Sequence, residues 1–490
     1  MAWATDAHNV RQFSFGVVGV KKLSLFSILL AMALLAGCST LRPWQNAAAP
    51  QISSHAAGPP GYGPENTDKR SIVAALTLSG GGARAAAFGL GVLRELKATR
   101  FTWEEEETTL LDEIGLISGV SGGSILAAHY AMFGDETLAR FESDFLLKNF
   151  QGDLIRSALS LSRFPKLMSP WYGRSNSLEE NLGVLYHGKT FGDLAARKRG
   201  PRLLITATDL TTGAPFEFTR EQFALICSDL DSVPLSFAVA ASSAVPLVLS
   251  PMTLQNHAGS CPHSPLAKPG LTTSIATNYR SRMMKIGAES YVDARERPFL
   301  HLVDGGLADN LGIRGLLDRV VATGSIQDSF RDRPPGSIRK LILITVNSER
   351  APAEQIDQSD RVPTLAQATG ALLFGAGSRG TQMTLALLED DLQRWNEELK
   401  HQRGTGDSPF ASDAEIYVVS VSLRDVPNTE RQRLLLRVPT AFTIEPGDVQ
   451  LLQDSAREAL SRSSTFQRLR QDLSTPTRPP IQSGDAVPEL

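Results

Sequence analysis

Short apolar runs alternate along this chain with stretches of helical or small-residue character. The apolar runs predict buried strands at residues 72–78, 114–117, 203–207, 299–303, 339–347 and 416–421. Apolar positions with helical spacing, or small residues that pack closely, predict helices at residues 85–97, 124–128, 238–246, 364–400 and 446–460. Strands that alternate with helices predict an α/β fold, with a mostly parallel central sheet between helices.

The stretches without clear periodicity set the expected domain limits. Residues 71–350 are expected to form a core, and residues 351–473 to complete the same domain with helices and a strand. Within the core, residues 253–298 predict an irregular insertion near the mouth of a site, which makes them a candidate lid. Residues 38–70 are rich in Pro, Ala, Gly and Ser and predict a flexible tether, and residues 474–490 predict a disordered tail.

The first 37 residues have the pattern of an export signal. Lys21-Lys22 precede a fourteen-residue apolar stretch that ends at Ala36. Fourteen residues are few for a helix that must cross about 30 Å of hydrocarbon, so a spanning anchor is the weaker interpretation. The following Gly37-Cys38 resembles the lipobox of bacterial lipoproteins, in which the signal is removed and the cysteine is acylated. That resemblance predicts removal of residues 1–37, a lipid anchor on Cys38, and an envelope location at the outer membrane because Ser39 follows the cysteine.

Composition narrows the classes of partner. The chain has 490 residues and a formal net charge of −3, so it lacks the basic excess that attracts nucleic acid. Three cysteines are too few for a disulfide-stabilised scaffold. An exported protein nevertheless meets an oxidising compartment, and we expect Cys227 and Cys261 to pair there. The alternative is one buried thiol and one loop thiol.

A candidate nucleophile lies between the second predicted strand and the helix after it. The segment Gly119-Val120-Ser121-Gly122-Gly123 has the G-x-S-x-G pattern of a nucleophile elbow, in the strand–turn–helix context that this pattern requires. Such a turn strains the serine backbone, and its glycine neighbours leave room for the crossing chain. The hydroxyl would then stand above the sheet at the positive end of a helix. The alternative is an ordinary Gly/Ser turn, because the pattern alone is common.

A second glycine-rich turn, Ser79-Gly80-Gly81-Gly82-Ala83-Arg84, follows the first predicted strand. Three consecutive glycines leave N–H groups free to converge on one point, which suits a phosphate or a developing oxyanion. With Ala85, the same turn fits the G-x-G-x-x-A dinucleotide fingerprint. That alternative needs an acidic residue at the end of the next strand. The candidates, residues 104–107, lie in a polar run that looks like a loop, and Ser121 would stay unexplained.

A candidate base follows the fourth predicted strand, in the turn Asp304-Gly305-Gly306. A serine hydroxyl is a poor nucleophile until a base takes its proton, and in a dyad a carboxylate takes it directly. A free aspartate, with a pKa of about 3.9, is a weak base at neutral pH. We therefore expect Asp304 to be half buried, with a raised pKa, and within hydrogen-bond reach of Ser121. The alternative is a plain surface turn.

A Ser-His-Asp triad is the competing arrangement. It needs a histidine after the acid, and beyond Asp304 the sequence has only His401, in a charged region. His129 is expected to be a packed or capping residue, and His301 alternates with core-facing positions. Three further polar residues near predicted element ends are expected to have turn and capping roles: Asp209, Ser242 and Ser243.

The three glycine turns, in this order, resemble the patatin-like phospholipases over about residues 72–460. The chain departs from the family pattern at Ala85, where the family has glycine. The resemblance implies a three-layer patatin-like fold and a Ser121–Asp304 dyad, in which the aspartate of the Asp-Gly-Gly turn is the partner of the serine. It also implies a supporting role for Arg84 beside the glycine turn. The oxyanion hole would come from four glycines: Gly80, Gly81, Gly82 and Gly122.

These features predict a serine-dependent lipid acyl hydrolase of phospholipase A or lysophospholipase type. Its substrate would be membrane phospholipid or another acyl lipid, and the lipid anchor would hold it at the membrane. Ser121 would attack the ester carbonyl, and water would release the fatty acid from the acyl-enzyme. The sequence has no cluster of metal ligands, so neither calcium nor another cofactor is expected. The alternative is a catalytically silent envelope lipoprotein of the same fold, acting in binding or assembly.

Overall fold

Eight strands form one sheet in the part of the chain that the structure describes. The computed structural model describes residues 44, 46–49, 70–158, 166, 169–260, 279–350, 356 and 359–474. The strand order is β12 (Phe410–Ser422), β11 (Ile338–Asn347), β2 (Ile72–Leu78), β5 (Ile114–Gly119), β6 (Arg202–Asp209), β10 (Phe299–Val303) and β9 (Met252–Gln255), with β7 (Pro215–Glu217) paired to β6. The first five strands pair in parallel, and β7, β9 and β10 pair antiparallel. The predicted, mostly parallel central sheet is confirmed.

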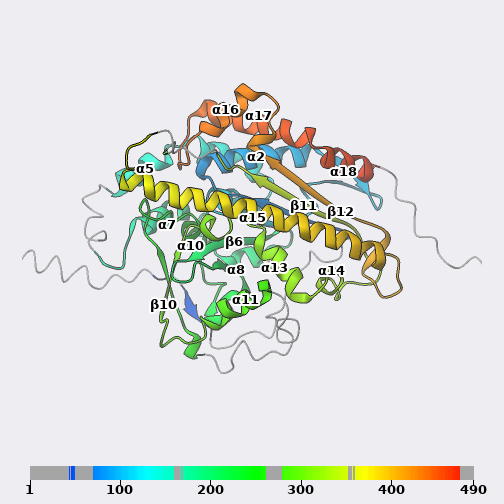
Figure 1. The fold of residues 1–490 in the computed structure, drawn as a ribbon, viewed down its shortest axis with the longest axis horizontal. Helices are drawn as coiled ribbons and strands as arrows, with labels where there is room; N and C mark the ends of the chain where they lie inside the picture. The colour runs from blue at the N-terminus through cyan, green and yellow to red at the C-terminus, as the bar shows by residue number, and fades with distance from the viewer. Residues whose placement is uncertain are drawn as a thin grey trace, which may run out of the picture.

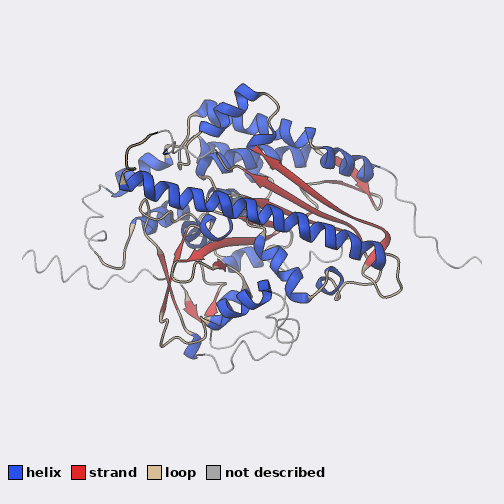
Figure 2. Cartoon of the chain, in the orientation of Figure 1, coloured by secondary structure: helices blue, strands red, loops and turns tan. Residues whose placement is uncertain are grey.

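Alternation along the strands supplies a core on each face of this sheet. In β11, Ile342 and Ile344 belong to one core, whereas Leu341 and Leu343 pack into the other. Parallel strands of this kind are apolar on both sides and need helices on both faces to exclude water. Figure 2 shows the strands between helices, which is the three-layer arrangement that the sequence predicts.

Helices of two groups cover the two cores. The larger core includes residues of α2 (Gly82–Ala98), α3 (Gly122–Phe133), α10 (Leu235–Ser242), α17 (Pro446–Arg462) and α18 (Ser464–Ser474). The second core includes residues of α13 (Arg314–Thr323), α14 (Ile326–Ser329) and α15 (Leu365–Gln402). α15 has 38 residues and crosses the width of the molecule as the yellow helix of Figure 1. It begins at a capping box in which Thr364 pairs with Gln367.

The other described elements are short. The helices are α4 (Glu136–Phe141), a π-helical turn (Glu142–Leu146), α5 (Phe150–Ala158), α7 (Arg174–Leu185), α8 (Phe191–Ala195), α9 (Arg220–Leu225), α11 (Tyr279–Glu289), α12 (Gly306–Asp309) and α16 (Thr429–Arg437), with 3₁₀ turns at Ala258–Ser260 and Leu423–Asp425. Two small sheets pair β1 (Ala47–Ala48) with β8 (Ser228–Asp229) and β3 (Arg100–Trp103) with β4 (Glu106–Thr109).

The irregular insertion predicted at residues 253–298 is wrong in part. Its first residues belong to β9, which pairs antiparallel with β10 and extends the main sheet. Its later part contains α11. β9 has only four residues, so its alternation of buried and half-buried positions was too short to stand out from the loop around it. Residues 261–278 lie outside the described part, so a lid role for this segment stays a prediction.

The polar run predicted as a loop near residue 104 is a β-hairpin. β3 and β4 pair antiparallel, and the turn places Glu104 and Glu105 at φ values of 51° and 72°. The strand that follows α2 in the main sheet is β5, and β5 ends at Gly119 rather than at an acid. The dinucleotide interpretation needs an acid at that strand end, so it is wrong.

Part of the predicted tether is docked on the domain. We call residues 44 and 46–49 the strap. The strap pairs through β1 with β8, and the ring of Trp44 lies 5.0 Å from the ring of Phe299. The buried Asn46 donates to Ser228 Oγ (2.8 Å) and to the Gln255 carbonyl (2.6 Å), and it accepts from the Gln255 N–H (3.0 Å). The prediction of a flexible tether is therefore wrong for these residues.

Of the three cysteines, only Cys227 lies in the part of the chain that the structure describes. Cys227 is disulfide-bonded, and both other cysteines, Cys38 and Cys261, lie outside the described residues, so its pairing with Cys261 stays a prediction. The predicted signal segment and residues 475–490 of the predicted tail also lie outside them, whereas Ser474, the first residue of that tail, is the last residue of α18. Among the described helices, none has the length and apolar character needed to cross a bilayer.

Candidate active site

The nucleophile elbow forms where β5 meets α3. Ser121 has φ 49° and ψ −122°, a strained conformation for a residue with a side chain. The next residue must be glycine because of a close approach: a Cβ on Gly122 would lie 2.1 Å from the Gly82 carbonyl oxygen. A Cβ on Gly123 would lie 2.3 Å from the Leu78 carbonyl oxygen. The two glycine-rich turns are therefore in direct contact, and the elbow predicted from the sequence is present.

Ser121 and Asp304 form the expected pair. The Ser121 hydroxyl donates to Asp304 Oδ2 over 2.8 Å, and the Gly306 N–H donates to Asp304 Oδ1 over 2.8 Å. The two carboxylate oxygens are thus divided between the nucleophile and the base's own turn. Ser121 is 7% exposed and Asp304 is 8% exposed, so the base is more deeply buried than the half-burial expected from the sequence.

The burial of Asp304 makes it a stronger base. Desolvation raises its pKa from 3.8 to about 6, and the hydrogen bonds from Gly306 and Ser121 oppose that rise. At neutral pH the carboxylate is still largely ionised, as a base must be. Its proton affinity is closer to the working pH than that of a free aspartate, which is the condition under which general-base catalysis is efficient.

Ser242, which the sequence analysis did not assign to the site, bonds the backbone at or next to both members of the pair. The N–H of Ser121 donates to Ser242 Oγ over 2.8 Å, and that hydroxyl donates to the Thr206 carbonyl over 2.7 Å. The Ser242 carbonyl accepts from the Gly305 N–H over 3.0 Å. The capping role expected for Ser242 is therefore wrong. Its place in the small-residue run before Pro246 was the available signal.

The glycine turn before α2 differs in one respect from the predicted oxyanion hole. The Gly80 N–H donates to the Asn310 carbonyl over 3.1 Å, so Gly80 is not a free donor and its assignment to the hole is wrong. Within the described residues, the N–H groups of Gly81, Gly82 and Gly122 donate to no protein acceptor. These three belong to the N-termini of α2 and α3, where the helix dipoles also favour negative charge.

Arg84 secures the glycine turn from inside the protein. It is 2% exposed, and it donates to the carbonyls of Ser348 (3.0 Å) and Val438 (2.8 Å) and to Thr440 Oγ1 (3.0 Å). Burial, with the nearby charge of Arg350, lowers the pKa of Arg84 to about 9, so it stays cationic at neutral pH. The guanidinium thus links the start of α2 to two distant loops, which is a supporting role.

The histidines lie away from the base. None of the hydrogen bonds that Asp304 makes within the described residues involves a histidine. His129 is buried, bonds Thr137 Oγ1 through Nδ1 (2.8 Å), and has its pKa lowered to about 4 by burial. His301 is exposed beside Thr253, and His401 is exposed near the end of α15. Within the described residues, Ser121 therefore pairs directly with Asp304, as in a dyad, and no histidine bonds Asp304, as a triad would require.

The remaining polar candidates have structural roles. Asp209 accepts from the Thr211 N–H in a turn, as expected, and it also forms a buried ion pair with Arg297 (2.6 Å). Burial alone would raise the pKa of Asp209, but the hydrogen bonds that it accepts, mainly from Arg297, outweigh this effect and lower the pKa. Ser243 is the C-cap residue of α10, as expected, and its N–H donates to the Val239 carbonyl over 3.0 Å. It is buried, and within the described residues its hydroxyl has no hydrogen-bond partner.

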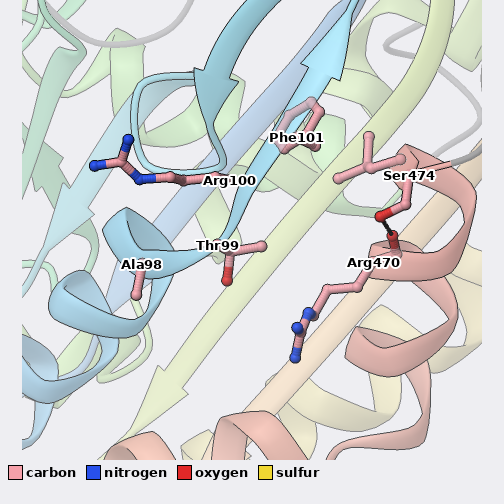
Figure 3. Close-up of a pocket in the computed structure, with 7 residues that line it drawn as sticks. Ala98, Thr99, Arg100, Phe101, Arg470 and Ser474 are labelled. Carbon is pink, nitrogen blue, oxygen red and sulfur yellow. Dashed lines mark hydrogen bonds between the residues drawn. The ribbon is translucent and has the colours of Figure 1, made fainter.

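Beyond the Ser121–Asp304 pair, a metal site or a nearby pocket could add further chemistry. No group of three or more His, Cys, Asp or Glu side chains among them is placed to hold a metal ion. A pocket of about 150 Å³ lies between the end of α2 and α18. Figure 3 shows it with Arg100 and Arg470 extending in different directions and the Ser474 hydroxyl bonded to the Arg470 carbonyl. The dyad lies at the opposite end of α2, about 25 Å away along that helix, so this pocket is no part of the site.

The fold and the site define the class: an α/β protein in which a serine after the parallel strand β5 is hydrogen-bonded to an aspartate after the antiparallel strand β10. Residues 76–317 match the patatin-like phospholipase family, so the chain contains a patatin-like phospholipase domain. That match includes the glycine turn, the elbow and the Asp-Gly-Gly turn.

Solved structures give more distant likenesses. Human GIVD cytosolic phospholipase A2 is 13% identical, with a TM-score of 0.43, covering 94% of this chain and 67% of that one. Its complex with methyl gamma-linolenyl fluorophosphonate is 13% identical, with a TM-score of 0.37, covering 82% of this chain and 59% of that one. VipD from Legionella pneumophila is 11% identical, with a TM-score of 0.27, covering 85% and 71%. No curated protein sequence matches the chain.

Proposed function

We propose that this protein is a serine-dependent lipid acyl hydrolase of phospholipase A or lysophospholipase type. The observation that carries the proposal is the 2.8 Å hydrogen bond from the Ser121 hydroxyl to Asp304, whose pKa is raised to about 6. A hydroxyl bonded to an ionised, desolvated carboxylate is the arrangement that activates a serine without histidine. The patatin-like phospholipase family of residues 76–317 supports acyl lipids as the substrate class.

The proposed reaction has two halves. Asp304 takes the Ser121 proton as the oxygen attacks the ester carbonyl, and the resulting oxyanion is stabilised by N–H groups of Gly81, Gly82 and Gly122. The protonated Asp304 then donates to the leaving alcohol, and an acyl-serine remains. In the second half, Asp304 takes a proton from water, the hydroxide attacks the acyl-serine, and Ser121 regains its proton as the fatty acid leaves.

Exposed apolar side chains on the segments that hold the base support a lipid substrate. The Ala244 carbonyl accepts the Asp304 N–H over 3.0 Å, and Leu247 and Val248, a few residues on, are 67% and 63% exposed. Leu307 lies three residues after the base and is 37% exposed. Large exposed apolar side chains near a reactive group suit contact with acyl chains.

The test is hydrolysis by the purified full chain. Phospholipid vesicles, lysophospholipid and short-chain p-nitrophenyl esters are compared for wild type, Ser121→Ala, Asp304→Asn and the control Ser243→Ala. We expect both dyad variants to lose at least about 10³-fold in kcat and the control to keep its rate. We also expect kcat/KM of the wild type to rise as the pH increases through about 6. Equal turnover by wild type and Ser121→Ala would refute the enzyme and favour the silent binding or assembly protein.

We also propose that the protein is lipid-anchored through Cys38 in a bacterial cell envelope, at the outer membrane. The support is the lipobox-like run that ends in Gly37-Cys38. Two or more acyl chains hold a protein stably at a bilayer, whereas one holds it only marginally. Metabolic labelling with an alkyne fatty acid is expected to tag the wild type and not Cys38→Ser. Equal labelling of the two would contradict the assignment.

A further inference from the structure

We propose that Ser242 is the positioning residue of the dyad, holding the nucleophile and the base in register through its hydroxyl and its carbonyl. The inference rests on the proposed hydrolase function and deepens it. Ser242 touches neither reacting oxygen, so it would act through Ser121 and through the turn after Asp304. It is fully buried as the last residue of α10.

The hydroxyl of Ser242 satisfies the strained elbow. At φ 49° the N–H of Ser121 is turned away from the ladder of β5 and is buried, where an unpaired donor would cost about 1–3 kcal/mol. Ser242 Oγ accepts a hydrogen bond from that N–H at 2.8 Å, and its hydroxyl donates one to the Thr206 carbonyl at 2.7 Å. Because this carbonyl belongs to β6, the hydroxyl links the elbow to the neighbouring strand.

The carbonyl of Ser242 holds the other half of the dyad. The last carbonyls of a helix have no partner within it and must find one outside. At the end of α10, the Ser242 carbonyl accepts from the Gly305 N–H (3.0 Å) and the Ala244 carbonyl accepts from the Asp304 N–H (3.0 Å). A Cβ on Gly305 would lie 2.1 Å from the Thr206 oxygen, so this turn presses against the same carbonyl that Ser242 bonds.

The contacts therefore converge on one buried point. The turns after β5 and β10 meet Thr206 of β6 there. The connecting groups are the Ser242 hydroxyl, the last carbonyl of α10 and the Ala244 carbonyl two residues further on. The 2.8 Å separation of Ser121 Oγ and Asp304 Oδ2 depends on the relative placement of these turns. A displacement of about 1 Å between reacting groups can reduce a rate on the order of 100-fold. The Ser121 N–H is also occupied, so it is not an oxyanion donor.

The experiment compares two adjacent buried serines. Ser242→Ala removes the bridging hydroxyl, and Ser243→Ala removes a hydroxyl that has no partner within the described residues. Ser242→Thr keeps the hydroxyl. For each variant and the wild type, kcat, KM and the thermal midpoint are measured, together with the rate at which a fluorophosphonate labels Ser121. The labelling rate reports the reactivity of the nucleophile without dependence on acyl-chain binding.

We expect Ser242→Ala to lower kcat and the labelling rate by about 10- to 100-fold while KM stays within about twofold. Ser243→Ala should match the wild type in both rates, and Ser242→Thr should recover most of the lost rate. Rates are compared well below the midpoint of the least stable variant, so that loss of folded protein does not imitate the effect.

Two results would overturn the positioning role. One is a Ser242→Ala enzyme that labels and turns over as fast as Ser243→Ala. The other is a defect confined to KM, which would place Ser242 in substrate binding. Failure of the underlying function has a different signature, because the wild type itself would then show no turnover that depends on Ser121.

Discussion

Asp304 is held in an environment that favours its protonated form, and this has a consequence for stability. Its pKa is raised from 3.8 to about 6 by burial, so the folded state binds its proton more tightly than the unfolded state does. The stabilising contribution is fully present below the unfolded pKa and is lost as the pH rises through about 6. Above that pH, ionised Asp304 destabilises the fold by about 3 kcal/mol.

Replacing Asp304 by asparagine should therefore stabilise the protein in a pH-dependent way. We expect urea unfolding to show a gain approaching about 3 kcal/mol for Asp304→Asn at pH 8 and little gain near pH 3, below the pKa of Asp304 in both the folded and the unfolded state. Ser243→Ala provides the pH-independent comparison. A gain of the same size at both pH values would contradict the raised pKa.

At position 122 only glycine fits, because any side chain would collide with the neighbouring backbone. A Cβ there would lie 2.1 Å from a backbone oxygen, which cannot move as a side chain can. We expect Gly122→Ala to lower the free energy of unfolding by about 2–4 kcal/mol and to abolish activity. The control is Gly447→Ala in α17, where a Cβ would meet nothing within 4 Å, and where alanine favours the helix. Equal stability of the two variants would show that the two glycine turns are not in contact.

Site residues that stand in short sequence motifs could be predicted from the sequence. Roles that depend on contacts between distant parts of the chain could not. Ser121, Asp304 and the glycines stand in short motifs at strand ends, where chain geometry and residue type act together. Ser242 gave no such signal, because its hydroxyl joins residues 121 and 36 positions away. Gly80 fitted the glycine pattern, but the carbonyl of Asn310, brought in by the turn after the base, occupies its N–H.

At the scale of elements, α11 is fixed to two other helices by buried charges. Arg280 bonds Asp318 of α13 (2.6 Å) and Asp391 of α15 (2.7 Å), and all three side chains are at most 12% exposed. Burial alone would lower the pKa of Arg280, but the two carboxylates raise it, so the cation is stabilised where it lies. The ion-paired cluster ties the end of the insertion to the helix that crosses the molecule.

Removing this arginine should be costly, because two buried carboxylates would each lose their most buried partner. Asp391 would keep only the more exposed Arg394 (2.7 Å), and Asp318 only the long contact to Arg314 (3.8 Å). We expect Arg280→Met to reduce the free energy of unfolding by about 3–5 kcal/mol, measured by urea denaturation. Arg295→Met is the matched control, since its side chain is 95% exposed and its contact with Asp293 is long, at 3.8 Å. That exposed pair should contribute less than about 1 kcal/mol. Equal effects in the two variants would mean that α11 is not held by its charges.

Element prediction succeeded where periodicity extended over enough residues. The apolar runs of β2, β5, β6 and β11 were found close to their observed limits, because buried parallel strands are apolar on both faces. β10 was also found, although it is antiparallel and its first residues alternate between exposed and buried. β12 was predicted at residues 416–421 but spans Phe410–Ser422, since its first residues alternate with exposed polar ones. β9 and α11 were missed for a related reason: each is short, and α11 is largely solvent-facing with little apolar signal.

At the scale of the whole molecule, the strap joins the chain's beginning to the far edge of the sheet. Composition alone predicted a flexible tether there, because the pairing partners of Asn46 lie about 180 to 210 positions away. We expect Asn46→Ala to cost about 1–3 kcal/mol, since it leaves the Gln255 N–H and carbonyl without this partner. It should also speed hydrogen exchange at the Ala49 amide, which bonds the Cys227 carbonyl.

The exposed Gln450→Ala, which loses only a contact to Asp454 on its own helix, is the control for that variant. Unchanged exchange at Ala49 in Asn46→Ala would show that the strap is held by its backbone pairing alone.

The strap also sets how far the domain can stand from whatever holds Cys38. Trp44 is six residues beyond Cys38, and six extended residues reach about 20 Å. Were the same chain free up to Ser71, its extended reach would be about 110 Å. With the proposed anchor in a bilayer, the docked strap would hold the domain within about 20 Å of the membrane surface. It would keep the β9–β10 edge of the sheet next to the headgroups and limit the faces that the domain can turn towards the bilayer.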